Sequence, residues 1–340
     1  MSQQVAPPAD TATDGGGFVI SLDFELHWGV CDREDALTNY RDNLLAARDV
    51  VPRLLALFDR TGIRATWATV GLLFFESRDE LLEHLPDTRP EYANRRLSAY
   101  EYLDTVGADE ADDPLHFAPS LIEQIDAAPG QELASHTFSH FYCLEKGNSA
   151  EAFDADLEAA RRAAELRDVE LTTLVFPRNQ LNPDYLPLLE KYGFQTYRGN
   201  PPAWMYQAAR QEEQNLARRG LRLLDSYLPL TNPTDGDNPP VQSDSAPANI
   251  PATRFLRPYF PTLQGLEEVR FRRIQREMRQ AAENGEIYHL WWHPHNFGEN
   301  TEENLAFLRR ILDVRRRLDA EHGMPSLTMA EAAQRKLVAA

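Results

Sequence analysis

The order of segments constrains the fold most: short apolar stretches alternate with longer amphipathic ones along the whole chain. Apolar runs predict buried strands, and apolar residues at helical spacing predict helices between them. This alternation indicates parallel strands joined by right-handed crossovers. Because the sequence has neither a dinucleotide-binding glycine fingerprint nor a phosphate-binding loop, we predict an α/β barrel rather than an open sheet. The predicted strands are residues 17–23, 63–70, 131–135, 171–176, 194–197, 254–256, 286–292 and 326–329.

Helices are predicted wherever apolar residues recur at helical spacing between these strands. Gly62 marks the end of the first helix, and Ser149 is a suitable cap for another. The arginines of the helix at 265–284 are interpreted as a solvated face. The predicted helices are residues 43–61, 71–84, 117–128, 149–167, 185–192, 265–284, 302–322 and 330–337, and the polar segment 89–114 is predicted to pass over the mouth of the site.

The domain organisation follows from composition. Residues 1–16 are polar and rich in Pro, Gly and Ala, so we expect a disordered leader without the pattern of a secretory signal. Residues 17–337 are predicted to form one domain with a flexible insertion at about 232–250. No apolar run is long enough to suggest a transmembrane helix, and the two cysteines offer no disulfide framework. A cytoplasmic location is the simplest expectation.

The net charge of −18 argues against nucleic-acid binding and against an anionic membrane surface. Basic residues number 35, yet the only lysines are Lys146, Lys191 and Lys336. An acidic, lysine-poor chain resembles proteins of salt-loving organisms. The plainer interpretation is an ordinary acidic protein.

Two histidines follow the predicted strand at 131–135. His136 and His140 are four residues apart, so their side chains share one side of a helical turn and could bind one metal ion. A hydrogen-bonded pair of histidines at a strand end is the alternative.

Other strand ends also carry reactive side chains. Asp23 and Glu25 follow the first strand, Arg178 the fourth, and His293 the strand at 286–292. In a parallel barrel these ends converge at one face, although Asp23 alone could also cap a turn. Two histidines and one carboxylate would hold a divalent metal and leave coordination positions open for water or substrate. A second carboxylate could act as general base and a further His as general acid. An Arg could keep the base ionised. This set suffices for metal-assisted hydrolysis of an amide or ester.

The sequence resembles the polysaccharide deacetylases of the NodB-homology type, carbohydrate esterase family four. SHTFSH is similar to that family's H-[ST]-x-x-H metal motif, and VISLDFELHWG to its first motif. FPRNQ lies where its arginine motif is found, HLWWHPHNFG resembles its last motif, and SLTMAEA its closing segment. The resemblance runs from about Gly17 to Ala333.

The resemblance implies a distorted (β/α)7 barrel that removes acetyl groups from N-acetylated sugars with Zn²⁺ or a similar divalent metal. It implies that His136 and His140 bind the metal, that Asp23 is the base, and that His293 is the acid. Arg178 would orient Asp23. The residues expected to contact a carbohydrate substrate are Trp28, Trp292, His295 and Arg257, with Trp291 as a further stacking candidate.

The sequence departs from the family pattern in two places. The usual adjacent Asp-Asp is Asp-Phe-Glu here, so the third ligand is Glu25 or Asp23, and we predict Glu25. The usual Arg-x-Pro is Pro-Arg-Asn-Gln. Such variants look like a divergent branch that also includes hydrolases of cyclic amides.

Four functions are therefore compared. The first is a metal-dependent deacetylase of an N-acetylated sugar or glycan precursor. The second is a hydrolase of another, cyclic amide C–N bond, and the third is an inactive carbohydrate-binding protein on the same scaffold. The fourth, an iron oxygenase with two His and one carboxylate, is disfavoured because that site is commonly built on antiparallel sheets.

Overall fold

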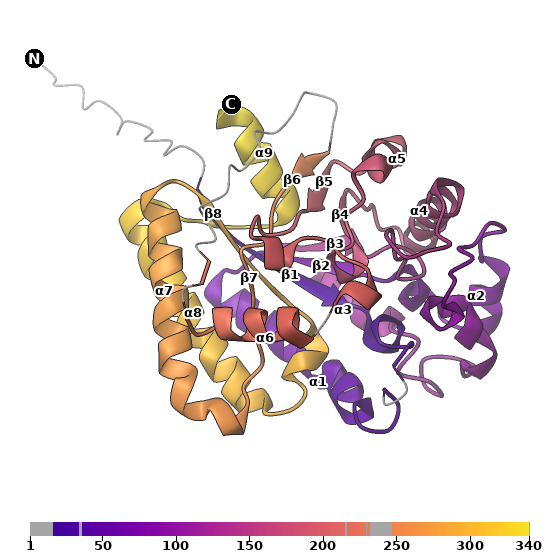
Figure 1. Cartoon of the computed structure of the whole chain (residues 1–340), viewed down its shortest axis with the longest axis horizontal. Helices are drawn as coiled ribbons and strands as arrows, with labels where there is room; N and C mark the ends of the chain where they lie inside the picture. The colour runs from indigo at the N-terminus through magenta and orange to yellow at the C-terminus, as the bar shows by residue number, and fades with distance from the viewer. Residues whose placement is uncertain (1–15, 34–35, 215, 229, 232–246, 340) are drawn as a thin grey trace, which may run out of the picture.

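The strands form one parallel, curled sheet at the centre of the protein, surrounded by helices (Figure 1). The computed structural model describes residues 16–33, 36–214, 216–228, 230–231 and 247–339. The order of strands is β6-β5-β4-β3-β2-β1-β8-β7, and β9 pairs with β1. These strands are β1 Gly17–Phe24, β2 Ala65–Thr69, β3 Gln131–Ser135, β4 Thr173–Val175, β5 Thr196–Arg198, β6 Ala248–Asn249, β7 Arg254–Phe255, β8 Ile287–Trp292 and β9 Ser326–Leu327.

The predicted distorted (β/α)7 barrel is confirmed as a parallel, barrel-like sheet, although it has more strands than seven. The additional strand β6 lies within the segment that was predicted to be an insertion. It pairs with β5 over only two residues. A strand this short is too brief to show an apolar pattern in the sequence.

Strand β1 is the centre of the sheet, and all its residues are buried. It pairs with β2 on one side and with β8 on the other, and because its side chains are buried on both faces of the sheet, the strand is apolar almost throughout. The register places Phe24 opposite Thr69 and Thr69 opposite Ser135. The residues that follow β1 and β3 therefore emerge at the same edge of the sheet.

Helices cover the sheet where the sequence predicts most of them. Helix α1 ends at Gly62, whose φ of 64° is the left-handed conformation that favours glycine at a helix end. Ser149 caps α4 by accepting a hydrogen bond from the backbone N–H of Ala152. The helices are α1 Arg41–Thr61, α2 Arg78–Glu83, α3 Pro119–Ala127, α4 Ala150–Glu165, α5 Leu186–Lys191, α6 Leu216–Asp225, α7 Glu267–Glu283, α8 Thr301–His322 and α9 Met329–Ala339.

The prediction of one helix over 71–84 is wrong. A 3₁₀ turn at Gly71–Phe74 is followed by extended chain at Phe75, and α2 begins only after Ser77. The side chains of the 3₁₀ turn are all buried, whereas a surface helix needs a polar face. The Ser77 side chain then accepts from the Glu80 N–H and starts a new helix.

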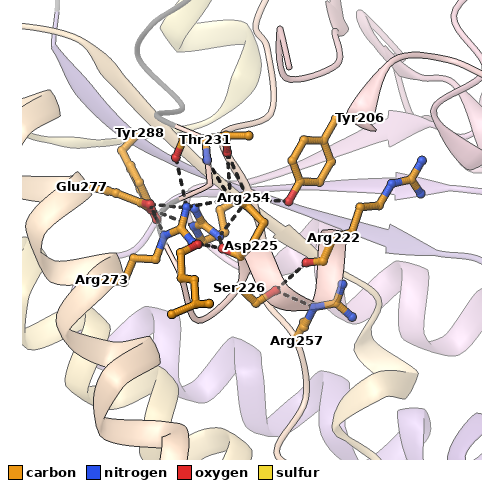
Figure 2. Close-up of polar contacts among 11 residues, drawn as sticks. Tyr206, Arg222, Asp225, Ser226, Thr231, Arg254, Arg257, Arg273, Glu277 and Tyr288 are labelled. Carbon is orange, nitrogen blue, oxygen red and sulfur yellow. Dashed lines mark hydrogen bonds and ion pairs between the residues drawn. The ribbon is translucent and has the colours of Figure 1, made fainter. Parts of the chain in front are cut away.

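The interpretation of the α7 arginines as a solvated face is wrong for Arg270 and Arg273, which are 2% and 3% exposed. Arg273 donates to Glu277 at 2.9 Å and to Asp225 at 3.1 Å. Arg254 from β7 forms two hydrogen bonds with the same Glu277, at 2.6 and 2.7 Å (Figure 2). The acidic partner Asp225 comes from α6, so helical spacing within α7 alone could not identify this network.

Parts of the predicted organisation lie outside the described residues, namely 1–15 of the leader and 232–246 of the insertion. None of the helices in the described part of the chain is long and apolar enough to cross a membrane.

The buried network predicts a large effect of a single substitution on stability. Glu277→Ala should lower the free energy of unfolding by about 3–5 kcal/mol, because Arg254 and Arg273 would keep their buried charges without this partner. The measurement is urea denaturation. Glu283→Ala, on the exposed side of α7, is the matched control and should change stability by less than about 0.5 kcal/mol. Equal effects of the two substitutions would contradict this prediction.

Candidate active site

The reactive residues predicted at strand ends do meet at one edge of the sheet. Asp23 lies near the end of β1, and Glu25 follows that strand. His136 follows β3, and His293 follows β8. Parallel strands bring their carboxyl ends together, and this places residues more than 250 positions apart in sequence side by side.

Glu25, His136 and His140 form a compact buried cluster that could hold a metal ion. Their potential ligand atoms all lie within 4.8 Å of one another. Glu25 Oε2 is 3.1 Å from His140 Nε2 and 3.4 Å from His136 Nε2. Asp23 Oδ2 is farther from His136 Nε2, at 4.0 Å. Two imidazole nitrogens and one carboxylate oxygen are a donor set that zinc accepts in catalytic sites.

The hydrogen bonds of His136 fix which of its nitrogens can bind a cation. Nδ1 lies 2.9 Å from the carbonyl oxygen of Val175, which can only accept, so Nδ1 carries the proton. In the neutral ring Nε2 then presents a lone pair, and this buried atom has no hydrogen-bond partner among the described residues. A lone pair facing a carboxylate is satisfied by a cation, and a backbone carbonyl on the other nitrogen is the usual support of a metal-binding histidine.

The electrostatics of the cluster favour a neutral His140 and an ionised Glu25. Burial lowers the pKa of His140 to about 4 despite the nearby Glu25. Burial alone would raise the pKa of Glu25, but the neighbouring side chains of His293, His136 and His140 together outweigh burial and bring this pKa well below its ordinary value. Both states are those that metal binding requires.

Asp156 of α4 fixes the segment that carries both histidines. Its carboxylate accepts from the backbone N–H groups of Phe138 and Ser139, at 2.7 and 3.1 Å, and from the Ser139 hydroxyl at 2.5 Å. Burial raises the pKa of Asp156 to about 6, so it is ionised at neutral pH. Thr137 and His140 adopt left-handed backbone conformations, with φ of 63° and 57°, which the surrounding structure must hold in place. No pattern in the sequence predicted this role of Asp156.

Gly29 provides the space in which the Glu25 side chain lies. A Cβ atom at position 29 would be 2.0 Å from Glu25 Cδ and 2.1 Å from its Oε1. Any larger residue there would displace the Glu25 carboxylate.

Asp23 is held by Arg198, not by Arg178. The two nitrogens of the Arg198 guanidinium donate to the two Asp23 oxygens, at 2.6 and 2.8 Å. Burial raises the pKa of Asp23, but the charge and hydrogen bonds of Arg198, with smaller contributions from His136 and His293, together lower it by more, and the net shift is downward. Arg198 also lies over the Trp291 ring, with 4.3 Å from its central carbon to the ring centroid.

The predicted contact between Arg178 and Asp23 is therefore wrong. Arg178 has a left-handed backbone, with φ of 52°, and its guanidinium pairs with Asp32 at 2.5 Å and lies over the Tyr142 ring. Arg198 was not predicted as the partner of Asp23. It is nevertheless the last residue of strand β5, and reactive residues at strand ends were the ones predicted to converge.

The His293 side chain lies close to the carboxylates of both Asp23 and Glu25. Its Nε2 lies 3.5 Å from Glu25 Oε1 and 3.8 Å from Asp23 Oδ2, while Nδ1 lies 3.1 Å from the Asn296 side-chain oxygen. With 22% of its side chain exposed, it is the solvent-facing member of the group. His295 is buried behind it and stacks on its ring, so the predicted substrate contact by His295 is wrong in this structure.

Two predicted stacking residues are core residues. Trp28 and Trp292 are both 0% exposed. The Trp28 ring nitrogen donates to the His116 carbonyl, and Trp292 stacks on Phe297. Neither indole is accessible to a substrate in this structure, so those two predictions are wrong. Trp291 instead lies beside His293, with ring centroids 5.7 Å apart.

A cavity of about 600 Å³ adjoins the site, and its lining includes His293, Trp291 and Arg257. Its volume is within the range of small-molecule binding sites. Arg257, predicted to contact substrate, is thus placed where it could do so, and His293 links the cavity to the two carboxylates.

Asp156→Ala should destabilise the protein by about 3 kcal/mol, because two buried N–H groups would lose their acceptor. Urea denaturation measures the change. Asp154→Ala, two residues earlier on α4, removes a surface pair with Lys191 and should cost about 1 kcal/mol or less. If the two variants were equally stable, Asp156 would not be the support of the histidine segment.

Comparisons with known proteins identify the fold. No family model matches the sequence, and no curated protein matches it. A putative polysaccharide deacetylase from Mycobacterium smegmatis has a TM-score of 0.60 at 15% identity, with 98% of this chain and 96% of that chain covered. A probable polysaccharide deacetylase from Pseudomonas aeruginosa PAO1 has a TM-score of 0.50 at 14% identity, with coverage of 94% and 90%. The Puue allantoinase has a TM-score of 0.52 at 13% identity, with 94% of this chain and 89% of that chain covered. The chain therefore has the fold of the polysaccharide deacetylases.

Proposed function

We propose that this protein is a metal-dependent hydrolase that removes the acetyl group from an N-acetylated sugar or glycan precursor. The observation that carries the proposal is the buried Glu25–His136–His140 cluster beside Asp23 and His293, at the mouth of a cavity. The fold shared with polysaccharide deacetylases supports a carbohydrate substrate.

Glu25, His136 and His140 would hold the divalent metal, with Zn²⁺ as the ion that best suits two imidazoles and a carboxylate. When bound, such an ion polarises a carbonyl oxygen and lowers the pKa of water. The protein keeps His136 in the tautomer that this role requires through Val175.

Asp23 would act as general base. Arg198 keeps its carboxylate ionised and fixes both oxygens, so it is the positioning residue in the place predicted for Arg178. His293 would act as general acid, because it is exposed to the cavity and close to both carboxylates. Asn296 orients the His293 ring from behind.

The second candidate is hydrolysis of another C–N bond, such as that of a cyclic amide. It is favoured by the likeness to an allantoinase, whose TM-score is close to those of the deacetylases. The same residues would perform the same roles, so assays must include both substrate classes.

Metal content and acetate release test the proposal together. The wild-type protein should contain about one Zn²⁺ or similar ion per chain, and His136→Ala/His140→Ala should lose both metal and activity. Gly29→Ala should also lower metal affinity although all three proposed ligands remain, because its Cβ takes the place of the Glu25 carboxylate. Elemental analysis and an acetate assay, each at low and high salt, measure these outcomes.

His322→Ala is the control, because this histidine lies on the surface at the end of α8. It should keep both metal and activity. A wild-type protein that takes up no metal on titration would refute the metal-dependent mechanism and favour an inactive binding protein.

Arg198 and Arg178 are distinguished by matched substitutions. Arg198→Lys should lower kcat by about 10–100-fold with metal content unchanged, because a lysine cannot hold both Asp23 oxygens. Arg178→Lys should leave kcat near the wild-type value, because Arg178 pairs with Asp32. A larger loss of kcat in Arg178→Lys than in Arg198→Lys would contradict the assignment. Steady-state kinetics are the measurement.

A further inference from the structure

The cavity beside His293 has an unusual charge for this protein. Across the chain, acidic residues outnumber Lys and Arg by 53 to 35. The lining of the cavity nevertheless includes five arginines and neither an aspartate nor a glutamate among the described residues; the arginines are Arg178, Arg219, Arg222, Arg254 and Arg257. Such a cavity concentrates positive potential within an acidic protein.

Two of these arginines are neutralised by carboxylates behind the wall. Arg178 pairs with Asp32, and Arg254 forms a bidentate pair with Glu277. Because these ion pairs neutralise their charges, neither arginine contributes most of the electrostatic attraction for an anionic ligand.

The other three have no carboxylate partner among the described residues. Arg222 donates to the backbone carbonyl of Met205, and Arg257 donates to the Ser226 hydroxyl. In Figure 2 the ends of both guanidinium groups lie apart from the network that encloses Arg254 and Arg273. Arg219 is exposed on α6 and lines the same cavity.

The electrostatic environment distinguishes the two groups of arginines. Burial lowers the pKa of Arg222, and the nearby charge of Arg218 lowers it further. Burial also lowers the pKa of Arg257. Burial acts in the same direction on Arg254, but there Glu277, together with Tyr288 and Tyr206, more than compensates for burial and the pKa is raised. Arg222 and Arg257 thus remain charged without the compensation that an anion would supply.

From this geometry we infer that the substrate of the site carries a phosphoryl group, which Arg222 and Arg257 bind with Arg219 at the cavity entrance. The inference rests on the proposed function: the phosphoryl group would anchor an N-acetylated sugar whose acetamido group reaches the site at His293. Guanidinium groups form charge-assisted, bidentate hydrogen bonds with phosphate oxygens, and several of them match a dianion better than a single carboxylate.

Binding measurements test the inference without relying on catalysis. Isothermal titration calorimetry of the full-length protein, with and without metal, compares N-acetylglucosamine with its 1-phosphate and 6-phosphate. At least one phosphate should bind about 10–100-fold more tightly than the neutral sugar, because charge-assisted hydrogen bonds are added. Arg222→Gln/Arg257→Gln should abolish that difference. Arg222→Lys/Arg257→Lys should keep part of it.

Arg276→Gln/Arg309→Gln is the matched control, because it removes the same charge from exposed positions on α7 and α8. This control variant should still bind the sugar phosphate more tightly than the neutral sugar. Equal binding of the neutral sugar and of its phosphates in both the free and the lipid-linked form, a preference that survives Arg222→Gln/Arg257→Gln, or tight binding of an N-acetylated uronic acid instead of the phosphates would each overturn the inference. If a phosphate binds as expected but no acetate is released from any sugar, the proposed deacetylation fails while the phosphoryl site stands.

A further binding experiment distinguishes a soluble sugar phosphate from a lipid-linked one. The same sugar phosphate is offered free in solution and attached to a polyprenyl chain in phosphatidylcholine vesicles. Binding of the free form supports a soluble sugar phosphate, and binding only in vesicles supports a lipid-linked one. Binding of neither form overturns the inference.

Discussion

The ion pair between Asp23 and Arg198 is the interaction on which the rest of the site depends. It joins β1 at the centre of the sheet to β5, four strands away, and both side chains are almost completely buried. Burial of two charges is costly unless their geometry is good and the remaining donors are satisfied. Here the pair is bidentate, and Ser21 and Asn179 accept further hydrogen bonds from Arg198, whose buried Nε alone has no hydrogen-bond partner among the described residues. The curl of the sheet and the ionised state of Asp23 are thus maintained by the same contact.

The convergence of the reactive residues could be predicted where it depended on strand ends. Asp23, Glu25, His136 and His293 could be identified because the carboxyl ends of parallel strands share one edge, whatever the details of the packing. The partner of Asp23 could not be chosen in this way. Arg178 and Arg198 both follow or end strands, and only the curl of the sheet and the left-handed backbone at Arg178 decide which one reaches the carboxylate.

The remaining errors share one physical cause, namely that residue type does not determine exposure. Trp28 and Trp292 were predicted to face substrate, yet indoles bury large areas and are accommodated in the core. The arginines of α7 were predicted to face water, yet Arg273 is buried because Asp225 and Glu277 neutralise it. In both cases a deciding partner comes from an element remote in sequence, His116 for Trp28 and Asp225 for Arg273, and periodicity within one element carries no information about it.

The cavity wall and the edge of the sheet that carries Glu25, His136 and His140 are built from different elements. The wall at Arg222, Arg254 and Arg257 belongs to α6 and to the chain around β7, and the Asp225–Arg273–Glu277 network braces it from α7. The edge belongs to β1 and β3, supported by Asp156 of α4. Exchanging wall residues can therefore change which molecules the cavity accepts while the Glu25–His136–His140 cluster stays the same.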